Sequence, residues 1–305
     1  MRVIVTGGAG FIGSHLISKL EQLGAEVIVL DDFSSGRKEN LAGFKGRIVN
    51  ASILDEDSLR KAVKGCELVF HLAAYVSAPR SMEEPTACID LNVKGTAAVV
   101  QAASEAGCKK IFFASSAAVY GDGEDKAKRE DSDLRPNSPY AVSKLAGEQL
   151  LTILGNTYNV KTVAFRFFNV FGPRQKIDSG YSAAIPSFCY RAIAGEQIEI
   201  FGDGNQTRDF IFVKDLVDAM VYVGEKENCE GVYNLGYGRE QSINDLAKEI
   251  RRLAKSQCEI YHQDERPGDV RESLADVSKL MATGWKPQIG FERGLRECVL
   301  AYQAE

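Results

Sequence analysis

A tyrosine and a lysine four residues apart, Tyr140 and Lys144, are the side chains of this sequence best suited to proton transfer. Ser138 and Pro139 precede them and are typical of a helix cap and first turn, so we predict a helix with both side chains on one face. A tyrosine is a poor base at neutral pH because its reference pKa is about 10, and a neighbouring ammonium favours the phenolate. Tyr140 is therefore a candidate acid/base and Lys144 its tuner. The same spacing also occurs on solvated helix faces.

A second candidate is the serine pair Ser115 and Ser116, which follows the apolar run Ile111–Phe113. If that run is a buried parallel strand, the serines lie at the sheet edge where such folds bind ligands. A hydroxyl there can hydrogen-bond a reacting oxygen beside Tyr140. Ordinary turn chemistry at a strand end is the alternative.

The segment Thr6–Gly13 is rich in glycine and lies between a predicted strand and a predicted helix. Gly7, Gly10 and Gly13 permit a tight turn that brings the backbone close to a pyrophosphate at the helix N-terminus. Asp31 ends the next predicted strand, where a carboxylate accepts hydrogen bonds from an adenosine ribose. This placement predicts NAD, because Asp31 would repel the 2′-phosphate of NADP. Arg37 and Lys38 leave a weaker case for NADP.

The elements that must position these residues alternate along the first half of the chain. Apolar strands are predicted at Val3–Val5, Val27–Leu30, Leu68–Leu72, Ile111–Ser115 and Thr162–Arg166. Helices are predicted at Ile12–Leu23, Glu56–Lys64, Asn92–Ala106 and Tyr140–Leu154, and later at Lys214–Val223, Ser242–Lys255 and Phe291–Tyr302. Ser242 is a candidate cap of its helix, with Asp245 three residues on. Such alternation is typical of an α/β fold with a doubly wound parallel sheet, the Rossmann fold.

We expect two lobes in a chain of 305 residues. Residues 1–166 are predicted to form an NAD-binding Rossmann domain, and residues 167–305 a smaller α/β lobe that binds the substrate, with the segments interleaved. The charged run Asp122–Asp131 is expected to be a solvated loop.

Seven motifs in order, from Met1 to about Phe291, make the chain resemble UDP-glucose 4-epimerase and its relatives in the extended short-chain dehydrogenase/reductase family. The motifs are Thr6–Gly13, Leu72–Ala74, Asn92–Thr96, Ser115–Gly121, the Tyr140/Lys144 pair, Arg166–Gln175 and Gly202–Phe210. The resemblance implies that Ser116 carries the catalytic hydroxyl together with Tyr140 and Lys144. Ser52 departs from the aspartate that often stands at this position in the family, which weakens one contact to adenine.

The resemblance also assigns the residues that bind the two ligands. For NAD they are Gly7, Gly10, Phe11, Ile12, Gly13, Asp31, Asp32, Ser35, Gly36, Ser52, Ile53, Leu72, Ala73, Ala74, Asn92, Ser115, Tyr140, Lys144 and Phe168. For a UDP-sugar they are Ser77, Ser116, Tyr140, Asn169, Ala184, Arg208, Arg266, Asp269 and Ser273. The two arginines suit a diphosphate, because a guanidinium holds it bidentately.

The activity that these residues imply is NAD-dependent 4-epimerisation of a UDP-hexose through a transient 4-keto sugar. A 4,6-dehydratase usually carries an Asp-Glu pair after the catalytic Ser or Thr, whereas Ala117 and Ala118 follow Ser116 here. A UDP-glucuronate 4-epimerase stays open, because Arg80 or Arg174 could meet a carboxylate. A non-catalytic NAD-binding protein would be expected to lose Tyr140 or Lys144.

The resemblance places Ser273 at a size gate beside the sugar. A bulky tyrosine there accompanies restriction to plain hexoses, and a small residue accompanies acceptance of a 2-acetamido group. Ser273 therefore predicts activity on UDP-GlcNAc and UDP-GalNAc in addition to UDP-glucose and UDP-galactose. The alternative is that Ser273 occupies a surface turn.

Composition limits the remaining partners. A net charge of −5 disfavours nucleic acid. Seven dispersed cysteines and three distant histidines predict free thiols and no zinc site. With no leader and no long apolar run, we predict a cytoplasmic protein without a membrane partner. We expect a homodimer, since relatives pair the helices near Asn92–Ala106 and Tyr140–Leu154. The small residues Ala97, Ala98, Val99 and Ala102 would permit close packing there, unless they face the sheet.

Overall fold

The computed structural model describes residues 1–123, 125–176, 183–265 and 270–304. The chain forms two compact units. The first contains Met1–Gly123, Glu130–Phe167 and Val217–Asn234. The second contains Glu124–Arg129, Phe168–Leu216 and Leu235–Glu305.

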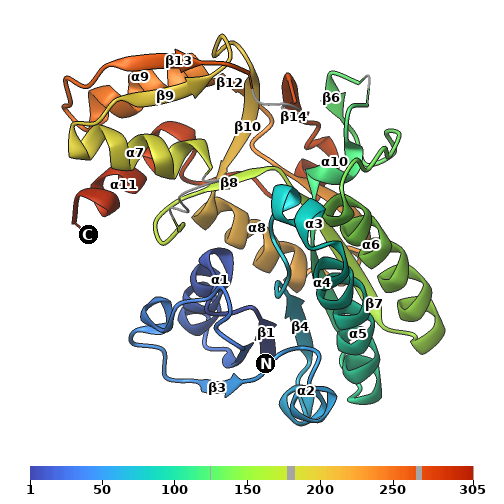
Figure 1. Cartoon of the computed structure of the whole chain (residues 1–305). Helices are drawn as coiled ribbons and strands as arrows, with labels where there is room; N and C mark the ends of the chain where they lie inside the picture. Colours follow the sequence, from blue (N-terminus) through green and yellow to red (C-terminus); the bar gives the residue numbers. More distant parts are fainter. Residues whose placement is uncertain (124, 177–182, 266–269, 305) are drawn as a thin grey trace. The chain divides into compact units, whose positions relative to one another are not determined.

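The first unit is built on a seven-stranded sheet in the order β11-β7-β5-β4-β1-β2-β3 (Figure 1). Its strands are β1 (Arg2–Thr6), β2 (Glu26–Asp31), β3 (Arg47–Asn50), β4 (Leu68–His71), β5 (Lys110–Ser116), β7 (Lys161–Phe167) and β11 (Gly231–Leu235). Neighbouring strands from β3 to β7 run parallel. The order reverses at β1, so the carboxyl ends of β1 and β4 flank a topological switch point, and the predicted doubly wound Rossmann fold is confirmed.

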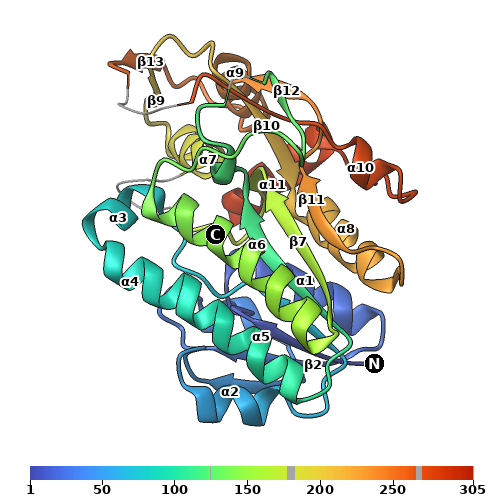
Figure 2. The ribbon, with the colours of Figure 1, turned by 90° about the vertical axis from the view of Figure 1, so that its right-hand side faces the viewer.

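Helices cover both faces of this sheet. They are α1 (Phe11–Gln22), α2 (Glu56–Val63), α3 (Ala78–Glu83), α4 (Pro85–Ile89), α5 (Gly95–Glu105), α6 (Pro139–Tyr158) and α8 (Val213–Glu225). Short turns complete the set at η1 (Lys38–Leu41), η2 (Asp90–Lys94) and η3 (Ala117–Tyr120). Figure 2 shows α2, α5 and α6 side by side over one face. On α1 and α8, Lys19 and Asp218 form an ion pair at 2.7 Å.

Alternation along β5 explains why the strand is apolar from Ile111 to Ala114. Phe112 stacks on Phe70 with ring centroids 4.5 Å apart and lies near Gly224 of α8. Phe113, the next residue, points to the opposite face and packs against Gly147 of α6. Because both faces are covered by helices, each side chain of the strand is removed from water.

The second unit contains a smaller mixed sheet in the order β12-β10-β14-β6, with β8 also paired to β10. Its strands are β6 (Ala127–Lys128), β8 (Asn169–Phe171), β10 (Thr207–Phe212), β12 (Glu240–Ser242) and β14 (Glu272–Ala275), and a separate pair joins β9 (Ile198–Phe201) to β13 (Ile260–Gln263). Its helices are α7 (Ala184–Ala194), α9 (Ile243–Leu253), α10 (Ser278–Met281) and α11 (Phe291–Ala304).

Two predicted helix caps are confirmed, and one predicted loop is wrong. Ser138 accepts a hydrogen bond from the Ala141 N–H and Ser242 accepts one from the Asp245 N–H. The charged run Asp122–Asp131 is not all solvated, because Ala127–Lys128 pairs with Leu274–Ala275 and the Lys128 side chain is buried. The Lys128 ammonium donates to the Asp125 carbonyl oxygen, which compensates for its loss of water.

Candidate active site

The glycine turn after β1 has a backbone that only glycine fits. Gly7 has φ +71°, and a Cβ added there would lie 2.6 Å from the Ala73 nitrogen. A Cβ at Gly13 would overlap the Gly7 carbonyl oxygen. Gly10 caps α1 without any side-chain hydrogen bond, so the first-turn amides of α1 face outward without a side-chain acceptor. A close backbone and an uncapped helix N-terminus fit a pyrophosphate, as the sequence predicted.

Asp31, at the end of β2, holds the glycine turn in place. Its two carboxylate oxygens accept hydrogen bonds from the Ala9 N–H at 2.8 Å and the Phe33 N–H at 2.9 Å. Burial raises the pKa of Asp31, and the two backbone donors oppose that rise. Each carboxylate oxygen keeps a further lone pair, so a ribose hydroxyl can still donate to it. Of the loop residues predicted to follow the adenosine, Asp32 accepts from the Ser34 hydroxyl, Ser35 is exposed, and Gly36 packs against Asp31.

Three of the residues predicted to contact the cofactor lie at the carboxyl edge of the sheet. Leu72, Ala73 and Ala74 follow β4 directly, and the Ala73 N–H donates to the Thr6 hydroxyl at the end of β1. These residues lie at the switch point of the sheet, where the fold class binds dinucleotides.

Asn92 and Ile53 instead use their side chains inside the protein. The Asn92 amide accepts from the Tyr75 N–H at 2.7 Å and donates to the Ser143 hydroxyl at 2.9 Å. Ile53 packs in the core against Gly95, so a cofactor contact from Ile53 has to come through its backbone. The Ser52 hydroxyl accepts from the Leu54 N–H at 3.3 Å.

The predicted catalytic residues come together at the carboxyl end of β5. The Tyr140 side chain lies beside that of Ser116, whose hydroxyl accepts from the Ala118 N–H at 3.1 Å. The Lys144 ammonium lies 5.7 Å from the centre of the Tyr140 ring and donates to the Ala114 carbonyl oxygen at 2.8 Å. Tyr140, Ser116 and Lys144 thus form one cluster built from a strand end and one helix face.

The charges of this cluster are set mainly by burial. Burial raises the pKa of Tyr140, and the hydrogen bond with Ser116 lowers it in part. Burial lowers the pKa of Lys144 to about 8. In the protein alone Tyr140 is therefore a neutral phenol at neutral pH, and a bound cation near the ring is needed to favour its phenolate.

Two buried polar residues near the cluster, His71 and Ser81, were not predicted. The His71 ring bonds the Thr6 hydroxyl at 2.8 Å and the Thr96 hydroxyl at 3.1 Å, which ties the ends of β1 and β4 to α5. The Ser81 hydroxyl accepts from the Tyr140 N–H at 3.1 Å and so holds the start of α6. Neither stands at a spacing that indicates chemistry, because their partners come from distant segments.

The second unit holds most of the residues predicted to bind the nucleotide-sugar. Arg208 and Ser273 are register partners on β10 and β14, and Asn169 is the first residue of β8. The Asn169 amide donates to the Asp209 carbonyl oxygen at 3.1 Å. Ala184 is the first residue of α7, and Phe168 is buried just before β8. Ser77, in the first unit, caps α3 by accepting from the Arg80 N–H. Arg266 and Asp269 lie outside the described residues.

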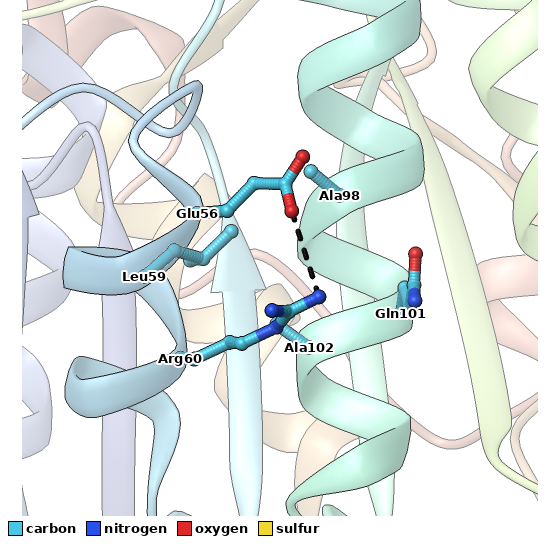
Figure 3. A pocket seen from close by; sticks show the side chains of 6 residues that line it. All are labelled: Glu56, Leu59, Arg60, Ala98, Gln101 and Ala102. Carbon is cyan, nitrogen blue, oxygen red and sulfur yellow. Dashed lines mark ion pairs between the residues drawn. The ribbon is translucent and has the colours of Figure 1, made fainter.

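A shallow hollow on the first unit lies between α2 and α5, apart from every predicted site residue (Figure 3). It is lined by Glu56, Leu59, Arg60, Ala98, Gln101 and Ala102. The Arg60 guanidinium already contacts the carboxylates of Glu56 at 3.5 Å and Glu105 at 3.4 Å. We therefore do not assign a ligand to this hollow.

The strand order and the glycine turn define a Rossmann-type dinucleotide-binding protein. A model of the "NAD dependent epimerase/dehydratase family" matches residues 3–236. The chain is 38% identical over 307 residues to the UDP-glucose 4-epimerase of Mycolicibacterium smegmatis, a match that covers 98% of this chain and 97% of that protein. The chain belongs to the NAD dependent epimerase/dehydratase family. The predicted family and the predicted NAD cofactor are confirmed.

Two further similarities show the range of reactions among relatives. The UDP-N-acetylglucosamine 4-epimerase of Methanobrevibacter ruminantium M1, solved in complex with UDP-N-acetylmuramic acid, has a TM-score of 0.96 and 39% identity, covering 99% of this chain and 98% of that chain. The UDP-N-acetyl-alpha-D-glucosaminuronate decarboxylase of Bacillus cytotoxicus is 35% identical over 313 residues, covering 98% of this chain and 96% of that protein. The similarity therefore extends to proteins named for different reactions on UDP-sugars.

Proposed function

We propose that this protein is a UDP-hexose 4-epimerase that uses bound NAD. The observation that carries the proposal is the neighbouring pair Tyr140 and Ser116, with Lys144 5.7 Å from the Tyr140 ring, at the carboxyl edge of a dinucleotide-binding sheet. Two of the three relatives described above are named 4-epimerases, which supports the same reaction.

The reaction divides between proton transfer by the protein and redox chemistry by the cofactor. NAD supplies a reversible hydride acceptor for C4 of the sugar. Tyr140 removes the proton from the sugar 4-hydroxyl, and Ser116 orients the same oxygen by a hydrogen bond. The 4-keto sugar turns in the pocket, and Tyr140 returns the proton when the opposite face of C4 is reduced. Lys144 adds positive charge beside the Tyr140 ring, which favours the phenolate.

Our assignment of the cofactor contacts rests on the fit of the first unit to a dinucleotide. Gly7, Gly10 and Gly13, with the amides of Phe11 and Ile12, would hold the pyrophosphate. Asp31 and the loop that contains Asp32, Ser35 and Gly36 would meet the adenosine ribose, and Ser52 and Ile53 the adenine. Leu72, Ala73, Ala74, Asn92, Ser115 and Phe168 would complete the cofactor site.

We assign the UDP moiety to Asn169, Ala184, Arg208, Arg266 and Asp269, with Ser77 as a further substrate contact. The Arg208 guanidinium can hold a diphosphate by two charge-assisted hydrogen bonds, which are stronger and more directional than the contact of an ammonium. An epimerase must keep its nucleotide bound while the sugar turns. Placing the strong contacts on the diphosphate and weak contacts on the hexose meets that requirement.

Two other reactions of the same family are less well supported. Ala117 and Ala118 follow Ser116 in η3 and cannot transfer protons, which disfavours a dehydratase. A uronate substrate would need a cation for its carboxylate. Of the two candidates, Arg80 already contacts the Glu84 carboxylate at 3.7 Å and the Tyr75 ring, so a uronate would compete with Glu84 there.

The sugar specificity depends in our proposal on Ser273. The residue lies in β14 opposite Arg208 rather than in a surface turn, and it is only partly exposed. A small side chain beside the proposed diphosphate contact leaves volume for a 2-acetamido group. We therefore propose that the enzyme accepts UDP-GlcNAc and UDP-GalNAc together with the plain hexoses. Ser273→Tyr should lower kcat/KM for UDP-GlcNAc by more than that for UDP-glucose, and equal effects on both sugars would refute the gate.

We further propose a homodimer formed through α4 and α6, which lie against each other in the first unit (Figure 2). Ile89 on α4 and Val142 and Ile153 on α6 are large apolar side chains that are exposed, Ile153 by 62%. Of the small residues predicted for this interface, Val99 and Ala102 face inward instead, because both belong to the core cluster. Light scattering at micromolar concentration should give the dimer mass for the wild type and a lower mass for Val142→Glu/Ile153→Glu.

We also propose that the protein works in a reducing compartment. All seven cysteines are free and buried, including Cys66 and Cys108, whose thiol pKa values burial raises to about 11 and about 12. This supports a cytoplasmic enzyme. Among the helices in the described ranges, none has the length and apolar character to cross a membrane.

The experiment that tests the proposed function is a comparison of three substrates. Purified protein is incubated separately with UDP-glucose, UDP-GlcNAc and UDP-glucuronate, and the products are identified by NMR. We expect C4 inversion of the first two. Loss of carbon dioxide or of water from any of them, without inversion, would replace epimerisation by the corresponding rival reaction.

A further inference from the structure

Helix α6 presents a stripe of three polar side chains, Tyr140, Lys144 and Glu148, spaced four residues apart. Residues at this spacing lie on one face of a helix. Each of the three holds one of three consecutive residues at the carboxyl end of β5. Lys144 donates to the Ala114 carbonyl oxygen, Glu148 accepts from the Ser115 hydroxyl, and the Tyr140 side chain lies beside Ser116. The first and third contacts belong to the proposed catalytic cluster, and the middle one does not.

The middle contact is completed by Arg166 of β7, the register partner of Ser115. Arg166 donates two hydrogen bonds to the Glu148 carboxylate, at 2.9 and 2.8 Å, and both side chains are almost wholly buried, with 3% and 5% exposed. A third donor of Arg166 reaches the Tyr120 hydroxyl at 2.9 Å and the Glu130 carbonyl oxygen at 3.0 Å. The buried ion pair therefore has hydrogen-bond partners on several sides, and these offset the cost of removing its two charges from water.

This arrangement fixes the direction of the β5 end more strongly than strand pairing alone. The Ser115 hydroxyl has a charged acceptor, and hydrogen bonds to charged groups are stronger than neutral ones. The next residue is Ser116, whose hydroxyl has to meet both Tyr140 and the reacting oxygen. If Ser115 lost its acceptor, the backbone that carries Ser116 would lose its nearest side-chain restraint. Catalytic geometry of this kind is sensitive to displacements on the order of 1 Å.

We propose that the Glu148–Arg166 ion pair, acting through Ser115, is a positioning element that holds Ser116 against Tyr140 and so sets the rate of proton transfer without contributing to UDP-sugar binding. The inference rests on the proposed function for its kinetic consequence. Its structural consequence, the placement of the Tyr140 ring, does not depend on which sugar is bound.

The experiment compares Ser115→Ala, Ser115→Thr and the paired replacement Glu148→Leu/Arg166→Met in the full-length protein with NAD. The paired replacement removes both buried charges together, so no unpaired charge remains in the core. Ser104→Ala is the matched control, because the Ser104 hydroxyl bonds only its own helix at the Val100 carbonyl oxygen. We expect kcat to fall on the order of 100-fold in the paired variant and by a smaller factor in Ser115→Ala. KM for the UDP-sugar should stay within about twofold in these variants, and Ser104→Ala should match wild type in kcat and KM. Ser115→Thr, which keeps the hydroxyl, should recover most of the kcat that Ser115→Ala loses.

A second readout separates this inference from the proposed function. With 3-fluorotyrosine at residue 140 and no substrate, fluorine NMR should show one narrow resonance in wild type, Ser104→Ala and Ser115→Thr. The resonance should shift or broaden in Ser115→Ala and in the paired variant. If the wild type epimerises no UDP-sugar but the resonance changes as expected, the proposed function fails and the positioning role stands.

Unchanged kcat and an unchanged resonance in both Ser115→Ala and the paired variant would overturn the inference. A rise in KM with constant kcat would also overturn it, because the ion pair would then act on binding. Should the paired variant fail to fold, Ser115→Ala against Ser115→Thr decides the question alone, since these differ in a hydroxyl and leave the ion pair intact.

Discussion

The neutral, buried His71 makes stability depend on pH in a calculable way. Burial, with the nearby positive charge of Lys144, lowers the pKa of His71 from 6.5 to about 3. Between these values the unfolded chain binds a proton at residue 71 and the folded protein does not, so the unfolded state gains stability as the pH falls. Each pH unit in this window contributes about 1.4 kcal/mol. Moving from neutral pH to about pH 5 should therefore lower the free energy of unfolding by about 2 kcal/mol through His71 alone.

Urea unfolding of the NAD-bound protein at about pH 7, 6 and 5 measures this slope. His71→Gln, which keeps a polar side chain between Thr6 and Thr96, should be less stable at neutral pH but should lose less stability on acidification. His262→Gln is the matched control for the substitution itself, because the His262 ring is exposed. Equal slopes in wild type and His71→Gln would refute the reasoning, since the titration would then belong to other groups.

Two further predictions concern charged residues of the proposed site. Burial lowers the pKa of Lys144 to about 8, so its ammonium destabilises the folded state below that pH. Lys144→Met should raise the free energy of unfolding at neutral pH by up to about 3 kcal/mol while turnover is lost; a less stable variant in thermal melts would contradict this. Arg208→Ala should raise the KM for the UDP-sugar roughly tenfold or more, because a charge-assisted bond is removed. Arg252→Ala, an exposed arginine paired with Glu249, should leave KM unchanged, and an equal rise in both variants would remove Arg208 from the substrate site.

Five strands of the first unit's sheet, β1, β2, β4, β5 and β7, were predictable because apolar residues dominate them. Several helices also have clear starts. Ser138 and Ser242 cap the helices that follow them, as their sequence context indicates. The strands β3 and β11 were not predicted. β3 lies at the sheet edge and is largely exposed, so its residues carry no buried pattern. The two-residue strand β6 was hidden in a charged run, because pairing with β14 is a long-range contact that local composition does not encode.

The site was predictable where function depends on local spacing and not where it depends on distant partners. The glycine turn and the Tyr140/Lys144 pair each lie within one short segment. His71 and Ser81 bond residues far away in sequence, and nothing near them marks that role. Glu148 is an intermediate case, because it continues the four-residue spacing of Tyr140 and Lys144. Its partner Arg166 ends a predicted strand and begins a family motif, but sequence spacing alone does not show that β7 lies beside β5.

The central claim is that the sugar is oxidised and reduced at C4 within one active site. UDP-glucose carrying deuterium at C4 tests it directly, with the product examined by NMR and mass spectrometry. We predict a C4-inverted sugar that retains its deuterium, because the hydride that leaves C4 returns to the same carbon without exchange with water. Tyr140→Phe should form almost none of this product while still binding UDP. A product without inversion at C4, or one inverted but with the deuterium replaced by solvent hydrogen, would contradict the account.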